Sequence, residues 1–310
     1  MSMLRSVLAA FALVVGLSLG AAAQAPNQAA KQAPQQQTFP TAEAAADAIV
    51  DALRKKDDKA TAAMLGAGWR DFVQGSPDEE DKQRADFLAA WDAAHKVVAD
   101  GDKATIEVGT TGFVMPIPLV KEAGGWRFDV DAGRTELTAR EIGRNELTVV
   151  QSLLAIVDAQ RDYSALDPMK TGVATYARRL LSSPGKKDGL YWQTTPGEPE
   201  SPLGALIARA QTGDVETEGY YGYHYRLLYG QGPAAKGGAH SYLVNGRMIG
   251  GFGAIAWPVR YGETGVMSFI VNQDGEVYEQ DLGPDTAQRA AAITLFDPDK
   301  NWQKADTTPP

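Results

Sequence analysis

Two short patterns in the chain could carry acyl-transfer chemistry. Ser183–Lys186 (SPGK) fits S-x-x-K, in which a serine attacks an acyl group with a lysine beside it, and Lys170–Gly172 (KTG) fits the K-T-G that accompanies it. Their surroundings argue against this chemistry. S-x-x-K should begin a helix, whereas Pro and Gly follow this serine, and K-T-G should lie on a later strand, whereas it precedes the serine. We therefore interpret both patterns as chance matches.

The histidines and paired acids give no recognised metal or acid–base site. The chain has three histidines, His95, His224 and His240, and no metal-ligand spacing joins them, although zinc held by the last two and a carboxylate stays open. Asp129 and Asp131 share a face of a predicted strand end, and we interpret them as solvated. Neither G-x-S-x-G nor H-E-x-x-H occurs. We expect no metal and no cofactor, and the missing motifs favour a non-catalytic role.

Aromatic residues of the second half are the candidates for a binding surface. Seven of the eleven tyrosines lie between Gly219 and Gly265. Aromatic side chains are enriched at interfaces and in sugar-stacking sites, but they also fill cores, which is the alternative here. The irregular segment Asp188–Trp192 is expected to be exposed, because loops lie on the surface. The candidate partner-surface residues are Tyr191, Trp192, His224, Arg226, Trp257 and Tyr261.

Composition excludes several classes of protein. The chain has 310 residues, with 30 Lys plus Arg against 39 Asp plus Glu, a net charge of −9 and a sequence pI near 5.0. This acidity argues against a nucleic-acid binder and against a polybasic membrane-surface protein. The absence of cysteine excludes disulfides, thiol nucleophiles, zinc–thiolate sites and iron–sulfur clusters.

The N-terminus predicts export. Arg5, the apolar run Val7–Leu19 and the small residues Ala21–Ala23 are typical of a secretory signal peptide, residues 1–23, cleaved after Ala23. The apolar run is shorter than the ~20 residues of a membrane-spanning helix, so an uncleaved anchor is the weaker alternative. No transmembrane segment is expected after cleavage, and the product should be periplasmic or secreted. Residues 24–37, rich in Gln, Ala and Pro, predict a disordered tether.

The remaining chain predicts an α+β fold in two parts. The first, residues 38–131, has a helix capped by Thr41, a helix at Lys59–Leu65, a helix from Asp78 to His95, and strands at Ala104–Val108, Phe113–Val120 and Trp126–Val130. The second, residues 132–310, has a long helix at Thr135–Tyr163, a helix at Val173–Leu181, strands at Tyr221–Tyr229, Ser241–Val244, Phe252–Trp257, Gly265–Val271 and Glu276–Gln280, and a closing helix to Phe296. Successive strands joined by short turns indicate an antiparallel sheet.

Several long strings resemble a known family. The strings EIGRNELTVVQ, GYYGYHYRLLYGQGP, YLVNGRMIGGFGAIAWPVRYGETGV and FIVNQDGEVYEQDLGPDT are similar to the bacterial exported family called domain of unknown function (DUF) 2950. The resemblance covers Thr38 to Trp302. It implies an exported protein of Gram-negative bacteria, and it supplies no catalytic residues.

Two resemblances at the level of fold add an expected architecture. The N-terminal helices followed by KEAGGWRFDV are similar to NTF2-like domains, which implies helices against a curved antiparallel sheet. The long helix followed by a β-meander resembles the globular part of type IV pilins, although the leader is not a prepilin signal. We expect a non-enzymatic binding or protein-interaction module with a protein or cell-envelope partner. The alternative is a small-ligand-binding or hydrolytic protein that uses a polar pocket in the NTF2-like part.

Overall fold

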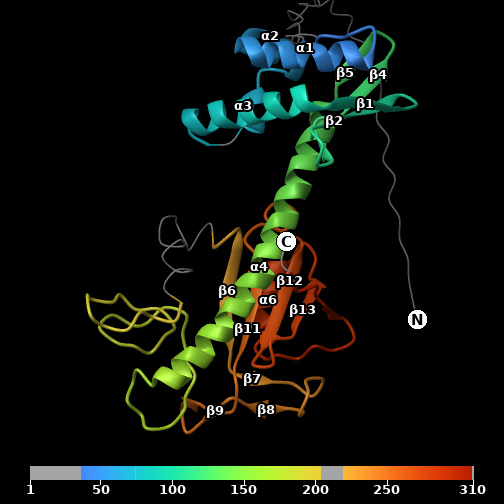
Figure 1. Ribbon diagram of the computed structural model, residues 1–310. Helices are drawn as coiled ribbons and strands as arrows, with labels where there is room; N and C mark the ends of the chain where they lie inside the picture. The colour runs from blue at the N-terminus through green and yellow to red at the C-terminus, as the bar shows by residue number, and fades with distance from the viewer. Residues whose placement is uncertain (1–35, 74, 204–218, 309–310) are drawn as a thin grey trace, which may run out of the picture.

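The computed structural model describes residues 36–73, 75–203 and 219–308. They form two packed units joined by one long helix, α4 (Val130–Leu166) (Figure 1). Both units combine helices with antiparallel strands, so the predicted α+β class is confirmed. The predicted signal peptide and most of the predicted tether lie outside the described residues. Within the described chain, no helix has both the length and the apolar character needed to cross a membrane.

Helices form one side of the N-terminal unit: α1 (Ala42–Lys55), α2 (Asp58–Leu65), the 3-10 helix η1 (Trp69–Phe72) and α3 (Pro77–Ala93). Side-chain caps explain where they begin. Thr41 Oγ1 accepts a hydrogen bond from the Ala44 N–H at 3.1 Å, which confirms the predicted N-cap of α1. Ser76 and Glu79 form a reciprocal capping box at the start of α3.

An antiparallel sheet forms the other side, in the order β1-β2-β4-β5, with β3 paired to β2. Its strands are β1 (His95–Asp100), β2 (Lys103–Val108), β3 (Phe113–Val114), β4 (Leu119–Glu122) and β5 (Gly125–Phe128). The sequence prediction lacks β1, because helical spacing extends the preceding helix to His95, whereas α3 ends at Ala93. The next residues pair along the full length of β2, where β-branched side chains such as Val97 fit.

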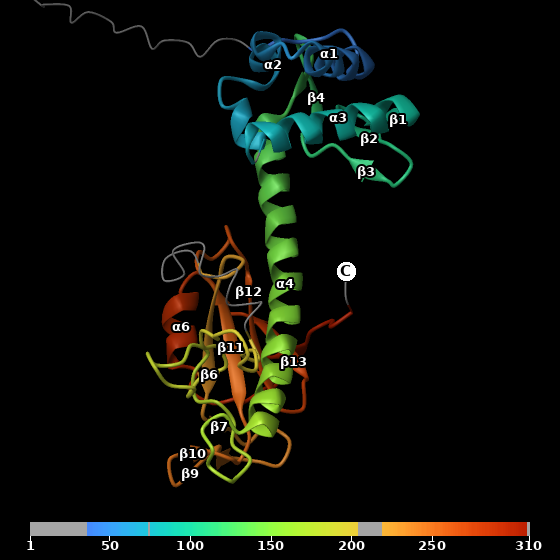
Figure 2. The ribbon, with the colours of Figure 1, turned by 60° about the vertical axis from the view of Figure 1, so that its left-hand side comes forward.

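The C-terminal unit contains a second antiparallel sheet, in the order β14-β13-β12-β11-β6. Its strands are β6 (Tyr223–Leu228), β11 (Gly253–Pro258), β12 (Met267–Asn272), β13 (Val277–Asp281) and β14 (Gln303–Lys304). Short strands β7 (Gly230–Gln231), β8 (His240–Ser241), β9 (Leu243–Val244) and β10 (Arg247–Met248) form two small ribbons at one end. Figure 2 shows the sheet between α4 and the short helix α6 (Thr286–Ala292).

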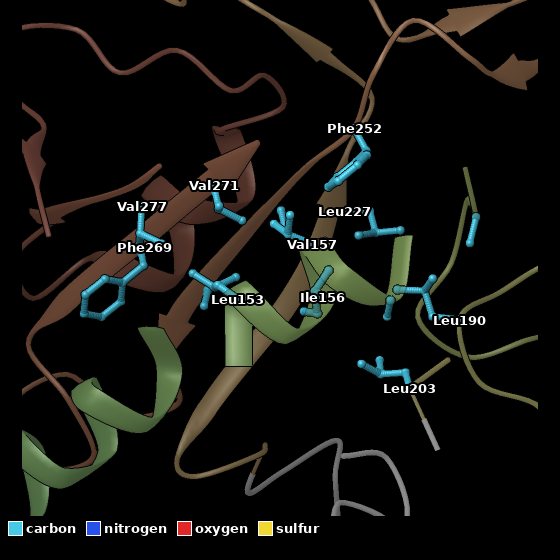
Figure 3. Packing of buried hydrophobic residues seen from close by; sticks show 14 of the residues in the cluster. Leu153, Ile156, Val157, Leu190, Leu203, Leu227, Phe252, Phe269, Val271 and Val277 are labelled. Carbon is cyan, nitrogen blue, oxygen red and sulfur yellow. The ribbon is translucent and has the colours of Figure 1, made fainter. Parts of the chain in front are cut away.

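The larger core of this unit lies between α4 and the sheet. Figure 3 shows Leu153 and Ile156 of α4 among the strand residues Leu227 and Phe269, with Leu190 of the segment after α4 at the side of the cluster. All five side chains are buried. Because one core includes helix, sheet and irregular segment, packing holds the segment after α4 in place without regular secondary structure.

The segment after α4 differs from its prediction. Val173–Leu181 is irregular, so the predicted helix there is wrong. Its backbone groups have partners far along the chain: the Tyr176 N–H donates to the Met248 carbonyl at 2.8 Å, and Ala177 bonds to the Gln160 side chain. These long-range bonds satisfy the groups that a helix would pair locally, and they override the helical spacing.

The middle of α4 connects the two units. Gly133, near its start, is buried against Ile117, and the next buried residue of α4 is Val149. The helix is continuous through Gly143, so that glycine does not break it. Side-chain bonds hold each end, including Arg140 to the Val114 carbonyl at 3.0 Å. The predicted boundary between residues 131 and 132 therefore falls in the first turn of a helix that belongs to both units.

Candidate functional site

Three of the six predicted surface residues lie together. His224 and Arg226 on β6 and Trp257 on β11 share one sheet face, with Trp257 directly opposite His224 and their rings 5.5 Å apart. Burial lowers the pKa of His224, which favours the neutral imidazole. The Arg226 guanidinium donates to the carbonyls of Ala290 and Ile293 at the end of α6, at 2.7 and 2.6 Å. Arg226 thus caps the C-terminal end of a helix, which is a structural role.

These three residues line a cleft of about 460 Å³ around strand β6, together with several tyrosines. Leu203 and Gly219 also line it, and the residues between them lie outside the described chain. Nothing in the described residues indicates what covers this cleft. It therefore carries no functional assignment.

The other three candidates lie apart from this cleft. Trp192 is only 6% exposed and Leu190 is fully buried, so the expected exposure of Asp188–Trp192 is wrong for both. Both side chains join the core beside α4. Tyr191 is partly buried against the same core, and the Tyr261 hydroxyl donates to the Asp281 carboxylate at 3.1 Å.

The residues of the acyl-transfer pattern make a local turn. The Ser183 hydroxyl donates to the Asp188 carboxylate at 2.9 Å, and the Lys186 N–H donates to the Ser183 carbonyl. No helix begins at this serine, which agrees with a chance match. His95 stacks on Trp91 with ring centres 3.8 Å apart. Among the described residues, no group of three or more His, Asp or Glu side chains could hold a metal ion.

A cavity of about 280 Å³ opens in the N-terminal unit, between the helices and the β3–β4 connection. Its walls are mainly apolar and come from every helix of the unit. The apolar lining residues are Ile49, Ala52, Leu53, Leu65, Trp69, Phe72, Val73, Phe87, Phe113, Met115, Pro116 and Ile117, and the polar ones are Lys56, Asp57, Asp58, Thr61, Glu80, Gln83 and Arg84. The sequence alternative expected a polar cavity in this part of the chain, and the cavity is found there with apolar walls instead.

Six charged side chains in or next to the cavity lining form a chain of ion pairs: Lys56, Asp58, Glu80 and Arg84 line the cavity, and Asp81 and Arg70 pair with them. We call this set the ionic rim. It runs from Lys56 to Asp81 (2.8 Å), from Asp81 to Arg84 (2.5 Å), from Arg84 to Glu80 (2.8 Å), from Glu80 to Arg70 (3.8 Å), and from Arg70 to Asp58. Cations and anions alternate along the rim in equal number, and each contacts an opposite charge. The rim itself therefore has no net charge, while Asp57, which also lines the cavity, is not part of an ion pair among the described residues.

The carboxylates and the hydroxyl of the described cavity lining are engaged in hydrogen bonds or ion pairs. The Thr61 hydroxyl, the one hydroxyl in that lining, donates to the Asp57 carbonyl at 3.0 Å. Asp57 itself caps α2 by accepting from the Ala60 N–H at 2.9 Å. The remaining lining carboxylates, Asp58 and Glu80, are ion-paired in the rim. This arrangement suits the burial of an apolar group better than hydrolysis, which needs an available base.

The sequence profile of the family "Protein of unknown function (DUF2950)" matches residues 36–305. The chain belongs to this DUF2950 family. The match begins just before α1, includes both units and ends in the segment after β14, so the two units and the helix between them make up the family's common domain. No curated protein and no solved structure matches the chain.

Proposed function

We propose that this DUF2950 protein is an exported, non-enzymatic binding protein of the cell envelope that holds a neutral apolar ligand in its N-terminal cavity. The observation that carries the proposal is the combination of apolar walls with an ionic rim whose charges are all paired. Export to the periplasm or beyond is supported by the signal-like N-terminus.

The size of the cavity limits the ligand. About 280 Å³ is just below the usual range for small-molecule sites, roughly 300–1,000 Å³. It suits a body the size of a naphthalene with one further phenyl ring, or a short alkyl chain. The aromatic walls, Trp69, Phe72 and Phe87, supply large apolar contact areas. A charged ligand would lose its hydration and find every charge of the ionic rim already paired, and Asp57, outside the rim, is engaged in capping α2, so we expect neutral ligands to bind best.

We infer an NTF2-like N-terminal unit, and what supports it is the order of helices before an antiparallel sheet, with a cavity between them. A pilin-like C-terminal unit is supported by a long N-terminal helix packed on an antiparallel meander. Both folds host many functions, so neither likeness adds a ligand.

A fluorescent neutral probe tests the proposal. N-phenyl-1-naphthylamine is titrated into the chain from Gln24, and its emission is expected to rise on binding. Val73, a half-buried wall residue, is changed to Phe to occupy the cavity. Val97→Phe is the matched control, because Val97 is half-buried against the same core but does not line the cavity.

The expected result is that Val73→Phe weakens probe binding by at least about tenfold, while Val97→Phe binds as the unmodified chain does. Circular dichroism checks that both variants are folded. Equal binding by all three proteins, or no binding by the unmodified chain, would contradict the proposal. A probe that binds to the C-terminal unit would also leave Val73→Phe unaffected and so give the contradicting result.

A further inference from the structure

A second cleft lies at the far end of α4 from the N-terminal cavity. Its volume is about 480 Å³, and we call it the arginine cleft because Arg178, Arg179 and Arg247 line it. Tyr163 of α4 and Tyr229, between β6 and β7, contribute to its walls. The volume is within the usual range for small-molecule sites. This cleft is independent of the proposed apolar site.

The backbone that carries two of these arginines is held rigidly. Residues 176–179 make hydrogen bonds to four separate parts of the chain. The Tyr176 N–H donates to the Met248 carbonyl, Ala177 exchanges two bonds with Gln160, the Tyr229 hydroxyl donates to the Arg178 carbonyl, and the Leu190 N–H donates to the Arg179 carbonyl. A segment fixed in this way presents its side chains from a constant position, which reduces the entropy lost when a ligand binds.

The charges of the cleft are not balanced as those of the ionic rim are. Among the described residues, no carboxylate oxygen lies within 4.0 Å of a charged nitrogen of Arg178 or Arg247, and the closest contact of Arg179 is Asp188 at 3.9 Å. Asp188 already accepts hydrogen bonds from the Ser183 N–H and hydroxyl. The cleft therefore has three arginines against one occupied carboxylate.

The nearby residues leave the region positive overall. Asp167, whose pKa is lowered mainly by hydrogen bonds from the Thr171 and Gly172 N–H groups, is an anion that also interacts with Arg247 and offsets part of the positive charge. Residues 169–189 contain five cationic residues and one acidic residue, although the whole chain has a net charge of −9. The Tyr163 hydroxyl is neutral, because burial raises its pKa to about 12. A positive region on an acidic protein indicates an anionic ligand.

We propose that the arginine cleft binds an organic anion carrying at least two phosphate or carboxylate groups. The planar guanidinium groups of Arg178 and Arg247 can each donate two parallel hydrogen bonds to such a group. Tyr176 and Tyr229 line the same cleft and supply apolar surface for the body of the ligand.

The test uses the chain from Gln24 and two probes, inorganic pyrophosphate and citrate, in separate calorimetric titrations at low salt. The cleft variant is R178Q/R247Q. The control variant is R161Q/R260Q, which removes the same charge from two exposed arginines of the C-terminal unit that do not line the cleft. Arg247→Gln alone is a second cleft variant, because no hydrogen bond of the Arg247 side chain is found in the described residues, so its loss should not affect folding.

At least one of the two probes is expected to bind. Both cleft variants should weaken the affinity for that probe, R178Q/R247Q by about tenfold or more, whereas the control variant should change it by less than about threefold. If only pyrophosphate binds, the ligand carries phosphate groups. If only citrate binds, the ligand carries carboxylate groups. If both bind, the cleft selects its ligand by charge. If neither probe binds, or if the control variant loses as much affinity as R178Q/R247Q, the proposal is wrong. These titrations do not measure binding of the neutral probe at the N-terminal cavity, so either proposal can be wrong while the other holds.

Discussion

The side-chain amide of Gln160 pairs with the backbone of Ala177 as a neighbouring strand would. Gln160 Nε2 donates to the Ala177 carbonyl at 2.9 Å, and the Ala177 N–H donates to Gln160 Oε1 at 2.8 Å. Both residues are buried. Through this pair, α4 holds the segment that carries Arg178 and Arg179 into the arginine cleft.

Gln160→Leu should therefore destabilise the protein strongly. The substitution leaves two buried backbone groups of Ala177 without partners, and the expected loss is about 2–4 kcal/mol in the free energy of unfolding. Urea denaturation measures it. Gln151→Leu, on the same helix, is the control, because Gln151 makes one hydrogen bond of 3.3 Å to the Thr307 carbonyl. Similar losses in the two variants would contradict the role of the pair.

Two glycines of α4 should respond to alanine in opposite directions. A Cβ at Gly143 would meet no atom within 4 Å, so Gly143→Ala should stabilise the helix by roughly 0.5–1 kcal/mol. A Cβ at Gly133 would lie 2.9 Å from Ile117 Cγ1, so Gly133→Ala should lower the melting temperature. Thermal melts measure both. A loss of stability in Gly143→Ala would mean that the middle of α4 is not a regular solvated helix.

Two glutamates of the C-terminal unit, Glu279 and Glu276, should contribute to the pH dependence of stability with opposite signs. Burial, with a smaller effect from Glu146, raises the pKa of Glu279. The folded state therefore binds the Glu279 proton more tightly than the unfolded state does. The resulting contribution to the free energy of unfolding is present below the ordinary glutamate pKa of about 4.3 and is lost as pH rises from there through the folded-state pKa. Glu279→Gln should stabilise the protein at pH 7.5 relative to the unmodified chain, and this gain should shrink toward pH 4.

The contribution of Glu276 to stability should change with pH in the opposite direction. Hydrogen bonds from Lys304 and Tyr278 lower its pKa, so its contribution is present at neutral pH and lost as pH falls through the folded-state pKa. Glu276→Gln should thus destabilise the protein slightly at pH 7.5 and have less effect in acid. Urea denaturation at the two pH values compares both variants. The same sign for the two substitutions at pH 7.5 would contradict this assignment.

The elements predicted well from the sequence are those determined by neighbouring residues. The cap at Thr41 and the strands predicted at Gly265–Val271 and Glu276–Gln280 agree with the structure, where β12 and β13 pair as an antiparallel hairpin. The prediction fails where distant residues decide. Strand β1 depends on pairing with β2, and Val173–Leu181 depends on bonds to Gln160 and Met248.

The candidate site residues were also mispredicted where residues distant in the sequence determine their surroundings. Arg226 looked like a surface residue because the end of α6, which it caps, lies 64 residues further along the chain at Ala290. Trp192 looked exposed because its segment is irregular, and its packing against Tyr163 is not visible in a local pattern. The apolar cavity could not be predicted, because its walls come from four helices and the β3–β4 connection, which are separate in the sequence.

The central claim, that the N-terminal cavity selects neutral apolar ligands, is tested most directly by comparing ligands of one chain length. Octanol, octanoate and octylammonium are each allowed to compete with N-phenyl-1-naphthylamine bound to the chain from Gln24. We predict that octanol displaces the probe at a concentration at least about tenfold lower than either ion does, because the paired rim offers an ion no partner. Displacement by octanoate or octylammonium at an equal or lower concentration would contradict the claim.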